Sequence, residues 1–425
     1  MENIFGYITV AAKNSTDEAK RGADFVCTGK NDELVIQKAV DECQKQNKNL
    51  YLLNGVYKID AFYDFGDGGP RAAISVPSSW REFIIMGQGH EYGYRVSFDN
   101  GVVLYVSDSA FDNVKDEQPD VIRSAWTARG IQNGASLRLE NLAIILDNNT
   151  HKVRCIDLRR TDRAESKNVT LIGYGEKLDG TNNFNLGTSS PDVAAVGCIG
   201  LTMTDGSNYN YSNYTNVFAY GFDEAIQVGG EHVVCINCGA ALSTYGFTFG
   251  NYEVNCGSNH PITMINCLDE RNINLPLFGN ACGDSDGNGG RLVGNQEITM
   301  ISQNFEVLYG DPGKIPGGKL GSYMRELTPG TWKGNIDFTL QPAHCHTNAV
   351  DAQVWEEDGS GIGIKTRNNC HKTVCSTEER LSYYPTHGQQ VFDTDKNKML
   401  VCIDAPKRLW VDFNGNMVDN NKYHP

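Results

Sequence analysis

Apolar positions near the amino terminus recur with the spacing of an α-helix. Asn31 or Asp32 is suited to cap such a helix, Glu33 suits its first turn, and its apolar side chains fall on one face: Val35, Ile36, Ala39, Val40 and Cys43. A strand, a turn and a second strand are predicted immediately afterwards, over residues 50–59. We therefore expect the helix, over residues 31–44, to cover the open end of the β-structure that follows.

Short segments of alternating apolar residues, separated by Gly, Asn and Asp, fill the chain from about residue 72 to about residue 302. Typical segments are 82–86, 102–106, 141–146 and 168–172. This alternation predicts short strands joined by turns, and no strong helical pattern recurs after the first 45 residues.

An Asn followed by an apolar residue or Cys recurs along the same region, at Asn141, Asn168, Asn216, Asn237 and Asn266. The gaps between them are 27, 48, 21 and 29 residues. We interpret the gap of 48 as two coils of a solenoid. The period is then about 21–29 residues, as in known solenoid repeats. We expect the Asn side chains to stack and to hydrogen bond from one coil to the next.

The sequence ADFVCTGKND at 23–32, with the helix pattern at 35–40 and the strands at 50–59, resembles the opening of many pectin-lyase-like β-helix proteins of Gram-positive bacteria and their phages. The resemblance implies an all-β fold, a right-handed single-stranded parallel β-helix with an amino-terminal capping helix. We expect four parts: an amino-terminal segment (1–22), the parallel β-helix (23–340), a connecting region (341–386) and a small carboxy-terminal β region (387–425).

A second segment, with GQQVFDTDKNKM at 388–399 and LWVDFNGNMV at 409–418, resembles a short module at the ends of phage tail fibres and tailspikes. This resemblance implies a homotrimeric tail protein that binds a polysaccharide or cell-surface glycan. Such a protein would lie in the virion tail if a phage encodes it. The resemblance leaves open a depolymerase activity, either as a glycoside hydrolase or as a lyase.

A third segment, with GQGH at 87–90, Arg95 and Asp99-Asn100, resembles an early coil of the inulin fructotransferases, which are trimeric β-helix enzymes. It implies an alternative, a free bacterial carbohydrate enzyme that acts as a fructan fructotransferase or a glycosidase. His90 and Arg95 are then candidate substrate contacts, although turn hydrogen bonding is the simpler role for both. A non-catalytic structural β-helix is the remaining alternative.

The charge of the chain limits its partners. The formal net charge is −15 and the pI is about 5.1, which argues against a nucleic-acid partner, because phosphate binding needs clustered Lys and Arg. An acidic surface suits a neutral ligand and would repel a polyanion unless a local basic groove exists. No stretch reaches about 18 apolar residues, so we expect no membrane insertion.

The 13 cysteines are spread singly along the chain. The first residues show no secretory signal, so we expect synthesis in the cytoplasm and buried thiols in place of a disulfide framework. The Cys235-x-x-Cys238 spacing is interpreted as core packing for the same reason.

Two pairs of neighbouring carboxylates are candidates for glycoside chemistry, which needs one protonated and one ionised acid. They are Asp223-Glu224 and Asp269-Glu270, 46 residues apart, which is near two coil periods. We expect both pairs to line one groove. A separation of two coils would favour an inverting over a retaining hydrolase. The alternative is that these acids are solvated turn residues.

Further polar residues are predicted to line the same groove. Arg271 is a candidate substrate contact, and the Gly-rich segment 279–294, which contains Asp284 and Asp286, is predicted to form one wall as a long loop. Tyr209 and Tyr211 share a face if that segment is extended, so they are candidates for stacking on a sugar or for a subunit contact.

No cofactor and no metal are expected. Asp284, Asp286 and Asn288 have the spacing of Ca²⁺ ligands but lack the distal Glu of an EF-hand loop. A zinc set would use His344, His346, Cys370, His371 and Cys375. Tidy paired Cys spacing is absent there, so buried thiols are the favoured interpretation.

Overall fold

The computed structural model describes most of the amino-terminal two thirds of the chain and parts of the rest. The described residues are 6–77, 82–89, 101–114, 117–126, 136–161, 163–173, 194–203, 211–230, 232–249, 261–270, 272, 277–278, 297–306, 325–326, 335–340, 364–366, 374–382, 388, 390–404, 407 and 409–418.

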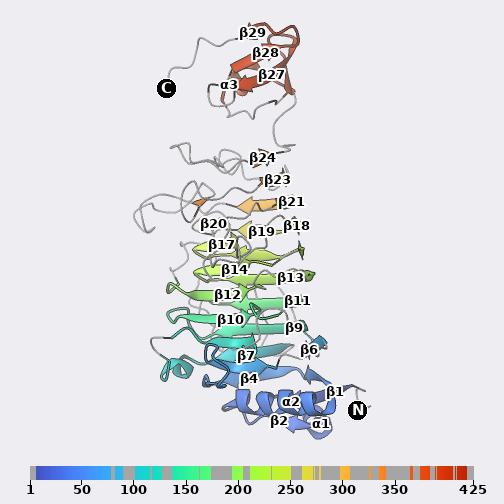
Figure 1. Ribbon diagram of the computed structural model, residues 1–425, viewed down its shortest axis with the longest axis vertical. Coiled ribbons are helices and arrows are strands. Elements are labelled where there is room, and N and C mark those ends of the chain that lie inside the picture. The colour runs from blue at the N-terminus through green and yellow to red at the C-terminus, as the bar shows by residue number, and fades with distance from the viewer. Residues whose placement is uncertain are drawn as a thin grey trace, which may run out of the picture.

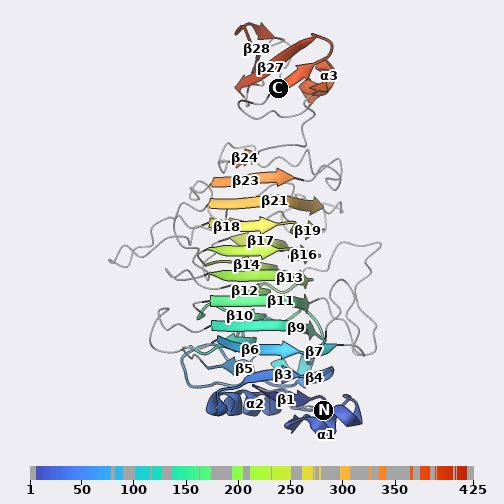
Figure 2. The same cartoon turned by 90° about the vertical axis from the view of Figure 1, so that its right-hand side faces the viewer.

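Two large parallel sheets dominate these residues and lie against each other as a stack of strands (Figure 1; Figure 2). The larger sheet has 16 described strands: β1 (Tyr7–Ala11), β2 (Phe25–Val26), β3 (Asn49–Leu52), β4 (Gly55–Ile59), β6 (Glu82–Gly87), β7 (Val102–Val106), β9 (Ser136–Leu146), β11 (Arg163–Ile172), β13 (Ser212–Tyr220), β15 (Val233–Ile236), β16 (Gly239–Ala241), β18 (Pro261–Ile265), β19 (Leu268–Glu270), β21 (Glu297–Glu306), β23 (Asn335–Leu340) and β24 (Ile364–Thr366). The smaller sheet has 8: β5 (Ala72–Val76), β8 (Asp120–Ser124), β10 (Val153–Asp157), β12 (Cys198–Thr202), β14 (Glu224–Val228), β17 (Tyr245–Phe249), β20 (Leu277–Phe278) and β22 (Arg325–Glu326).

The chain passes alternately through the two sheets, and each complete passage is called a coil below. In the larger sheet β9 pairs with β11 and β11 with β13, while in the smaller sheet β10 pairs with β12 and β12 with β14. The strand pairings described within these two sheets are all parallel. The predicted all-β class with large parallel sheets is therefore confirmed.

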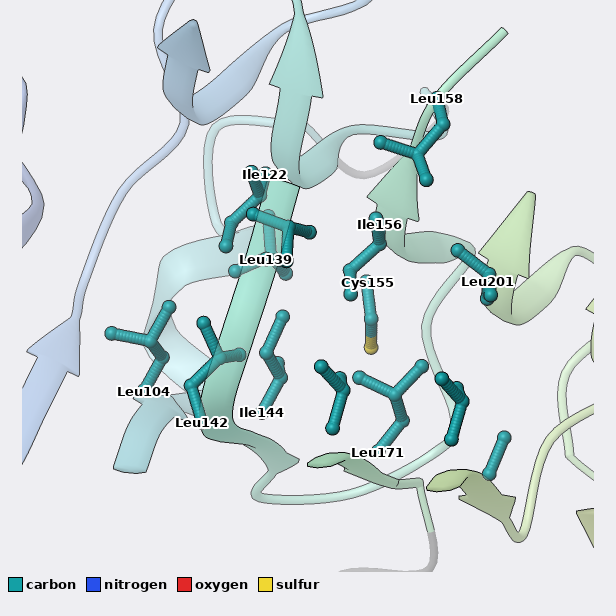
Figure 3. Packing of buried hydrophobic residues seen from close by; sticks show 14 of the residues in the cluster. Leu104, Ile122, Leu139, Leu142, Ile144, Cys155, Ile156, Leu158, Leu171 and Leu201 are labelled. Carbon is teal, nitrogen blue, oxygen red and sulfur yellow. The ribbon is translucent and has the colours of Figure 1, made fainter. Parts of the chain in front are cut away.

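The apolar core fills the space between the two sheets (Figure 3). Leu142, Ile144 and Leu171 come from the larger sheet, and the smaller sheet contributes pairs of consecutive residues: Val121-Ile122, Cys155-Ile156 and Ala225-Ile226. Two neighbours in a regular strand point to opposite faces, so strands of the smaller sheet must bend where both reach the core. The two residues that flank each pair are three positions apart in the sequence, and both then face away from the core.

A ladder of asparagines marks one turn of the stack. Asn141, Asn168, Asn216, Asn237 and Asn266 all adopt the left-handed conformation, with φ between 51° and 56°. The Asn168 side chain donates to Asn141 Oδ1 at 2.9 Å, Asn216 donates to Asn168 at 2.9 Å, and Asn266 donates to Asn237 at 2.8 Å. The predicted Asn stacking is confirmed. Asn tolerates this backbone conformation better than other side chains, which explains its recurrence.

The predicted coil count between two of these residues is wrong. Val169 lies directly beside Val217, so Asn168 and Asn216 belong to adjacent coils. The gap of 48 residues is therefore one long coil and not two. Part of this coil, residues 174–193 and 204–210, lies outside the described residues.

The amino-terminal helix α2 (Asp32–Gln46) packs on β1, β3, β4 and β5, at the end of the stack where N lies in Figure 1. It buries the predicted face through Ile36, Ala39, Val40 and Cys43, and it extends two residues past the predicted end. Asn31 makes no side-chain capping bond. The carboxylate of Asp32 instead accepts from the backbone N–H groups of Gly29 at 2.8 Å and Lys58 at 2.9 Å, which ties the helix start to β4. A shorter helix, α1 (Asp17–Gly22), precedes it.

A separate sheet of 5 described strands lies near the carboxy terminus, with β25 (Val374–Cys375), β26 (Gln390–Asp393), β27 (Lys398–Asp404), β28 (Leu409–Asp412) and β29 (Met417–Val418). Helix α3 (Thr377–Ser382) accompanies it, and the short 3-10 helix η1 (Asp108–Phe111) belongs to the main stack. Strands β26 to β29 run antiparallel, and Trp410 is buried in a small core with Val391 and Leu400. The region where a small carboxy-terminal β unit is predicted thus holds an antiparallel meander around Trp410.

The cysteines of the described residues are buried free thiols, as expected: Cys27, Cys43, Cys155, Cys198, Cys235, Cys238, Cys267, Cys375 and Cys402. Seven of them belong to the main core, among them both members of the Cys235-x-x-Cys238 pair. The other predicted zinc ligands, His344, His346, Cys370 and His371, lie outside the described residues.

Candidate ligand-binding site

The two predicted carboxylate pairs lie in different sheets. Glu224 opens β14 of the smaller sheet and is aligned with Tyr245 in the next coil, and Asp223 immediately precedes it. Asp269 and Glu270 belong to β19 of the larger sheet. The prediction that both pairs stack at equivalent positions along one groove is therefore wrong. The two coils that follow Glu224 span 21 and 29 residues, so the position equivalent to Glu224 two coils on lies beyond Glu270.

Asp269 points towards the interior. It is aligned with Ala240, a core residue, and it is 2% exposed. Its Oδ1 accepts from Asn272 Nδ2 at 2.6 Å, while Oδ2 is buried with no partner among the described residues. Burial raises the pKa of this carboxyl to about 7, an effect that the Asn272 hydrogen bond partly offsets.

The other pair is tied into the scaffold. Asp223 Oδ2 accepts from the Gly197 backbone N–H at 2.9 Å, and burial raises the pKa of Asp223. Glu224 Oε2 accepts from the Thr248 hydroxyl at 2.7 Å. These contacts hold successive coils of the smaller sheet together. They also place Glu224 beside the polar residues described below.

Only part of the remaining predicted site falls in the described residues. Tyr211 is 64% exposed and stacks on His232, with ring centroids 4.7 Å apart. The predicted contacts that lie outside the described residues are Tyr209, His90, Arg95, Arg271, Asp284 and Asp286.

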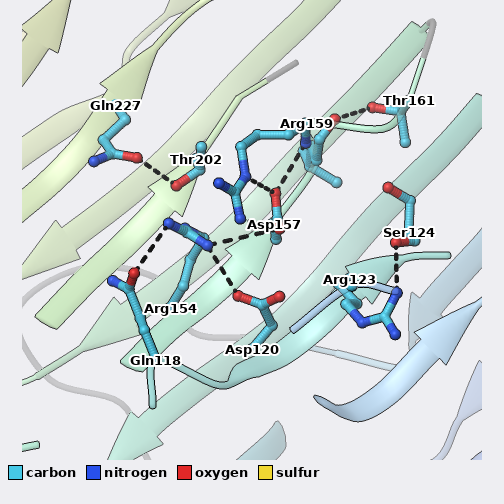
Figure 4. Close-up of polar contacts among 12 residues, drawn as sticks. Gln118, Asp120, Arg123, Ser124, Arg154, Asp157, Arg159, Thr161, Thr202 and Gln227 are labelled. Atoms are coloured by element: carbon cyan, nitrogen blue, oxygen red, sulfur yellow. Dashed lines mark hydrogen bonds and ion pairs between the residues drawn. The ribbon is translucent and has the colours of Figure 1, made fainter. Parts of the chain in front are cut away.

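A row of polar side chains follows the outer face of the smaller sheet (Figure 4). We call it the polar row. Strand register aligns its members in two lines. The first holds Asp120, Arg154 and Glu224, with Ile199 between the last two, and the second holds Arg123, Asp157, Thr202, Gln227 and Thr248. Several of these side chains are buried, and buried polar groups must find partners or lose free energy.

Hydrogen bonds connect the row across coils. Arg154 Nη1 lies 3.2 Å from Asp120 Oδ1 and 3.7 Å from Asp157 Oδ2, so one guanidinium nitrogen faces both carboxylates. Arg159 donates to Asp157 through Nε at 2.9 Å and through Nη2 at 2.8 Å. Further along, the Thr202 hydroxyl donates to Gln227 Oε1 at 2.6 Å. These bonds are drawn as dashed lines in Figure 4.

The two carboxylates have opposite protonation tendencies. Burial raises the pKa of Asp120 well above its usual range, and the nearby charge of Asp157 raises it further. Burial acts on Asp157 in the same direction, but the charges of Arg159 and Arg154 outweigh it and hold the pKa of Asp157 well below its usual range. Asp120 also keeps one buried oxygen, Oδ2, without a partner among the described residues. The surroundings therefore favour the protonated form at Asp120 and the ionised form at Asp157.

One end of the polar row reaches the surface beside Trp126. The carboxylate of Asp67 binds both terminal nitrogens of Arg123, at 2.7 and 2.8 Å, and accepts from the Trp126 backbone N–H at 2.8 Å. The guanidinium carbons of Arg159 and Arg160 lie 5.3 and 4.5 Å from the centre of the Trp126 ring. Arg159 is 12% exposed and Arg160 is half-buried, so a ligand can contact the row at this end.

The polar row was missed at the sequence level because its spacing is unlike that of a strand. Asp120 and Arg123 are three residues apart, as are Arg154 and Asp157, whereas outward residues of a regular strand are two apart. The bend that buries Val121 and Ile122 together causes the difference. A repeated polar-apolar-apolar-polar pattern is the signal that could have found the row.

In the described stretches, no group of three or more His, Cys, Asp and Glu is arranged to hold an ion. None of the helices described here is long and apolar enough to cross a membrane.

Comparison with known proteins leaves the family open. No family model matches the chain, and no curated protein matches it. Among solved structures, the chain matches tailspike protein 3 of bacteriophage CBA120 with 13% identity over 90% of this chain and 67% of the other. The TM-score of 0.14 is too low to show a common fold, so the function must be argued from the site.

Proposed function

We propose that this chain is a right-handed parallel β-helix protein that binds a glycan at the exposed end of the polar row. The observation that carries the proposal is the row itself, a set of charged and amide side chains held on a rigid sheet with one end at the surface beside Trp126. Sugars offer many hydroxyl groups, and carboxylate, guanidinium and amide groups can pair with them. Asp120 has one oxygen without a partner among the described residues, and a purely structural role would leave this unexplained.

The β-helix part of the proposal covers residues 23–340, with the carboxy-terminal β region at 387–425 as a separate unit. Its support is the alternate passage of the chain through two parallel sheets and the Asn ladder at one turn. The proposed place of the protein is a phage or prophage tail, which rests on the resemblance of residues 388–418 to tail-fibre modules.

Glycan-array binding by the full chain tests the proposal. We expect the wild type to retain a subset of glycans, and we expect Trp126→Ala to lose at least tenfold in affinity for them, because the ring holds both arginines at the entrance. Tyr51→Ala, an aromatic truncation on the larger sheet, is the matched control and should bind as the wild type does. A wild-type chain that binds no glycan, or equal losses in both variants, would argue against a site at the polar row.

Cleavage of the bound glycan is the second candidate function, and the Asp120 and Asp157 pair favours it. Glycosidases use one protonated carboxyl as the acid and one ionised carboxylate as the base or nucleophile, and burial and the arginine charges favour those two forms at Asp120 and Asp157. Both carboxyls are buried, so cleavage requires that a bound ligand displaces the side chains that cover them. Asp223, Glu224, Asp269 and Glu270 remain predicted catalytic residues from the sequence. Reducing-end release from bound glycans by the wild type and by Asp120→Asn tests the idea, which fails if the two release sugar at the same rate.

A further inference from the structure

The charges at the entrance of the polar row are unequal. Arg123 is paired with Asp67, and Arg159 is paired with Asp157, each through two hydrogen bonds. Arg160 lies beside them, and no carboxylate among the described residues forms an ion pair with it. Its described contact is the face of the Trp126 ring, at 4.5 Å. Among the described residues, the entrance therefore has one more guanidinium than carboxylate.

The deeper residues do not remove this excess. Arg154 is shared between Asp120 and Asp157, and Asp157 is already bound by Arg159. Asp120 is fully buried, and a buried carboxyl is driven towards its neutral form. The whole chain carries a net charge of −15, so a local cationic excess is contrary to the average of its surface.

The contact with Trp126 orients Arg160 for ligand binding. A guanidinium that lies over an aromatic ring keeps its N–H donors free around its edge, because the ring interacts with the planar face. Those donors match two oxygens of a carboxylate or a sulfate. Arg160 is half-buried, so it is accessible to a ligand while its position is held by packing.

We propose that the glycan is anionic and that Arg160 binds an oxyanion group on it, a carboxylate or a sulfate ester. This inference rests on the proposed glycan-binding function and adds the class of ligand to it. The acidic surface repels polyanions elsewhere, so this entrance directs such a ligand to one place on the molecule. Trp126 is a positioning residue for Arg160 in this scheme.

Four polymers test the inference with the full-length chain: alginate, carboxyl-reduced alginate, dextran sulfate and dextran. Calorimetric titration should show binding of alginate or dextran sulfate, and the member of the pair that binds identifies the oxyanion. The uncharged counterpart should bind at least tenfold more weakly. Binding should weaken as salt is raised, because exposed charge pairs are screened.

Variants of two arginines locate the binding. Arg160→Ala should lose at least tenfold in affinity for the anionic polymer, and Arg160→Lys should recover only part of it, because an ammonium cannot bind two oxygens side by side. Arg163→Ala is the matched control, since Arg163 lies on the larger sheet and is 51% exposed. The thermal midpoint of each variant shows that it is folded. If Arg160→Ala does not fold, Arg160→Gln takes its place.

The outcomes separate the inference from the function on which it rests. Equal binding of charged and uncharged polymers, with no effect of Arg160→Ala, overturns the anionic ligand and leaves glycan binding standing. Equal losses in Arg160→Ala and Arg163→Ala show unspecific attraction and also overturn it. A wild-type chain that binds none of the four polymers and no glycan of the array overturns both proposals.

Discussion

At the scale of single residues, the ionisation of Asp269 opposes folding. Its pKa is raised to about 7 in the folded chain, mainly by burial, whereas an exposed Asp titrates near 3.9. A raised carboxyl pKa means that the folded state binds the proton more tightly than the unfolded state. The stability from Asp269 is therefore fully present below about pH 4 and is lost as the pH rises to about 7.

The direction of this pH dependence gives a prediction for Asp269→Asn, which mimics the neutral carboxyl. The wild type should lose about 4 kcal/mol of unfolding free energy relative to the variant between pH 4 and pH 8, because the shift spans about three pH units. Urea unfolding of both chains at several pH values measures the difference. Parallel pH profiles would show that Asp269 ionises freely in the folded state. Glycan cleavage by the same variant tests the catalytic role predicted for Asp269 from the sequence.

The Asn ladder gives a second prediction at this scale. Asn168 donates to Asn141, accepts from Asn216 and has a φ of 54°. Asn168→Ala should lower the unfolding free energy by about 2–4 kcal/mol, because it loses two hydrogen bonds and strains the backbone. Asn168→Gly keeps the backbone conformation and should lose less. Chemical denaturation of the two variants separates the contribution of the hydrogen bonds from that of the backbone conformation. Equal losses of unfolding free energy would mean that the backbone conformation contributes nothing.

At the scale of elements, α2 covers the apolar end of the core. Val40 is fully buried on the face that packs against the sheets, while Leu34 on the same helix is 41% exposed. Val40→Asp should cost at least about 3 kcal/mol, because it buries a carboxylate without a partner. Leu34→Asp is the matched control and should change stability by less than about 1 kcal/mol. Thermal unfolding followed by circular dichroism compares them, and similar midpoints would show that α2 is not needed to close the core.

Elements with regular periods could be predicted from the sequence, and elements that depart from them could not. The buried face of α2 and the Asn turns were predicted because helix periodicity and left-handed Asn are local properties. The polar row was missed because Val121 and Ile122 both enter the core, which breaks the strand period. The prediction that the two carboxylate pairs line one groove was wrong for another reason. Coil length varies, so sequence distance does not measure position along the stack.

At the scale of the whole molecule, the larger sheet has an apolar line on its outer face. Ile236, Ile265 and Ile301 are aligned in successive coils, and Ile301 is 40% exposed. A line of Ile on a parallel sheet is unusual for a surface that meets only water. Burial against further copies of the chain would account for it, as a homotrimer would require, and the polar row lies on the other sheet.

Light scattering coupled to size exclusion tests the assembly. We expect a particle of about three times the chain mass of 46.8 kDa. Ile301→Asp should shift the particle towards smaller mass if the apolar line forms the interface. Lys167→Asp, a charged replacement in the same register column but two coils before Ile236, should not. A stable monomer at micromolar concentration would contradict the homotrimer.

The long coil between Asn168 and Asn216 has a consequence for how such a chain can be altered. Neighbouring coils differ in length by about 20 residues, yet the ladder bond between these two side chains has the same length, 2.9 Å, as the bond between Asn141 and Asn168. The ladder bond thus restores the alignment of the strands after the long coil. Foreign peptides grafted between β11 and β12 should therefore be displayed on the side of the stack, while the coils above and below keep their alignment.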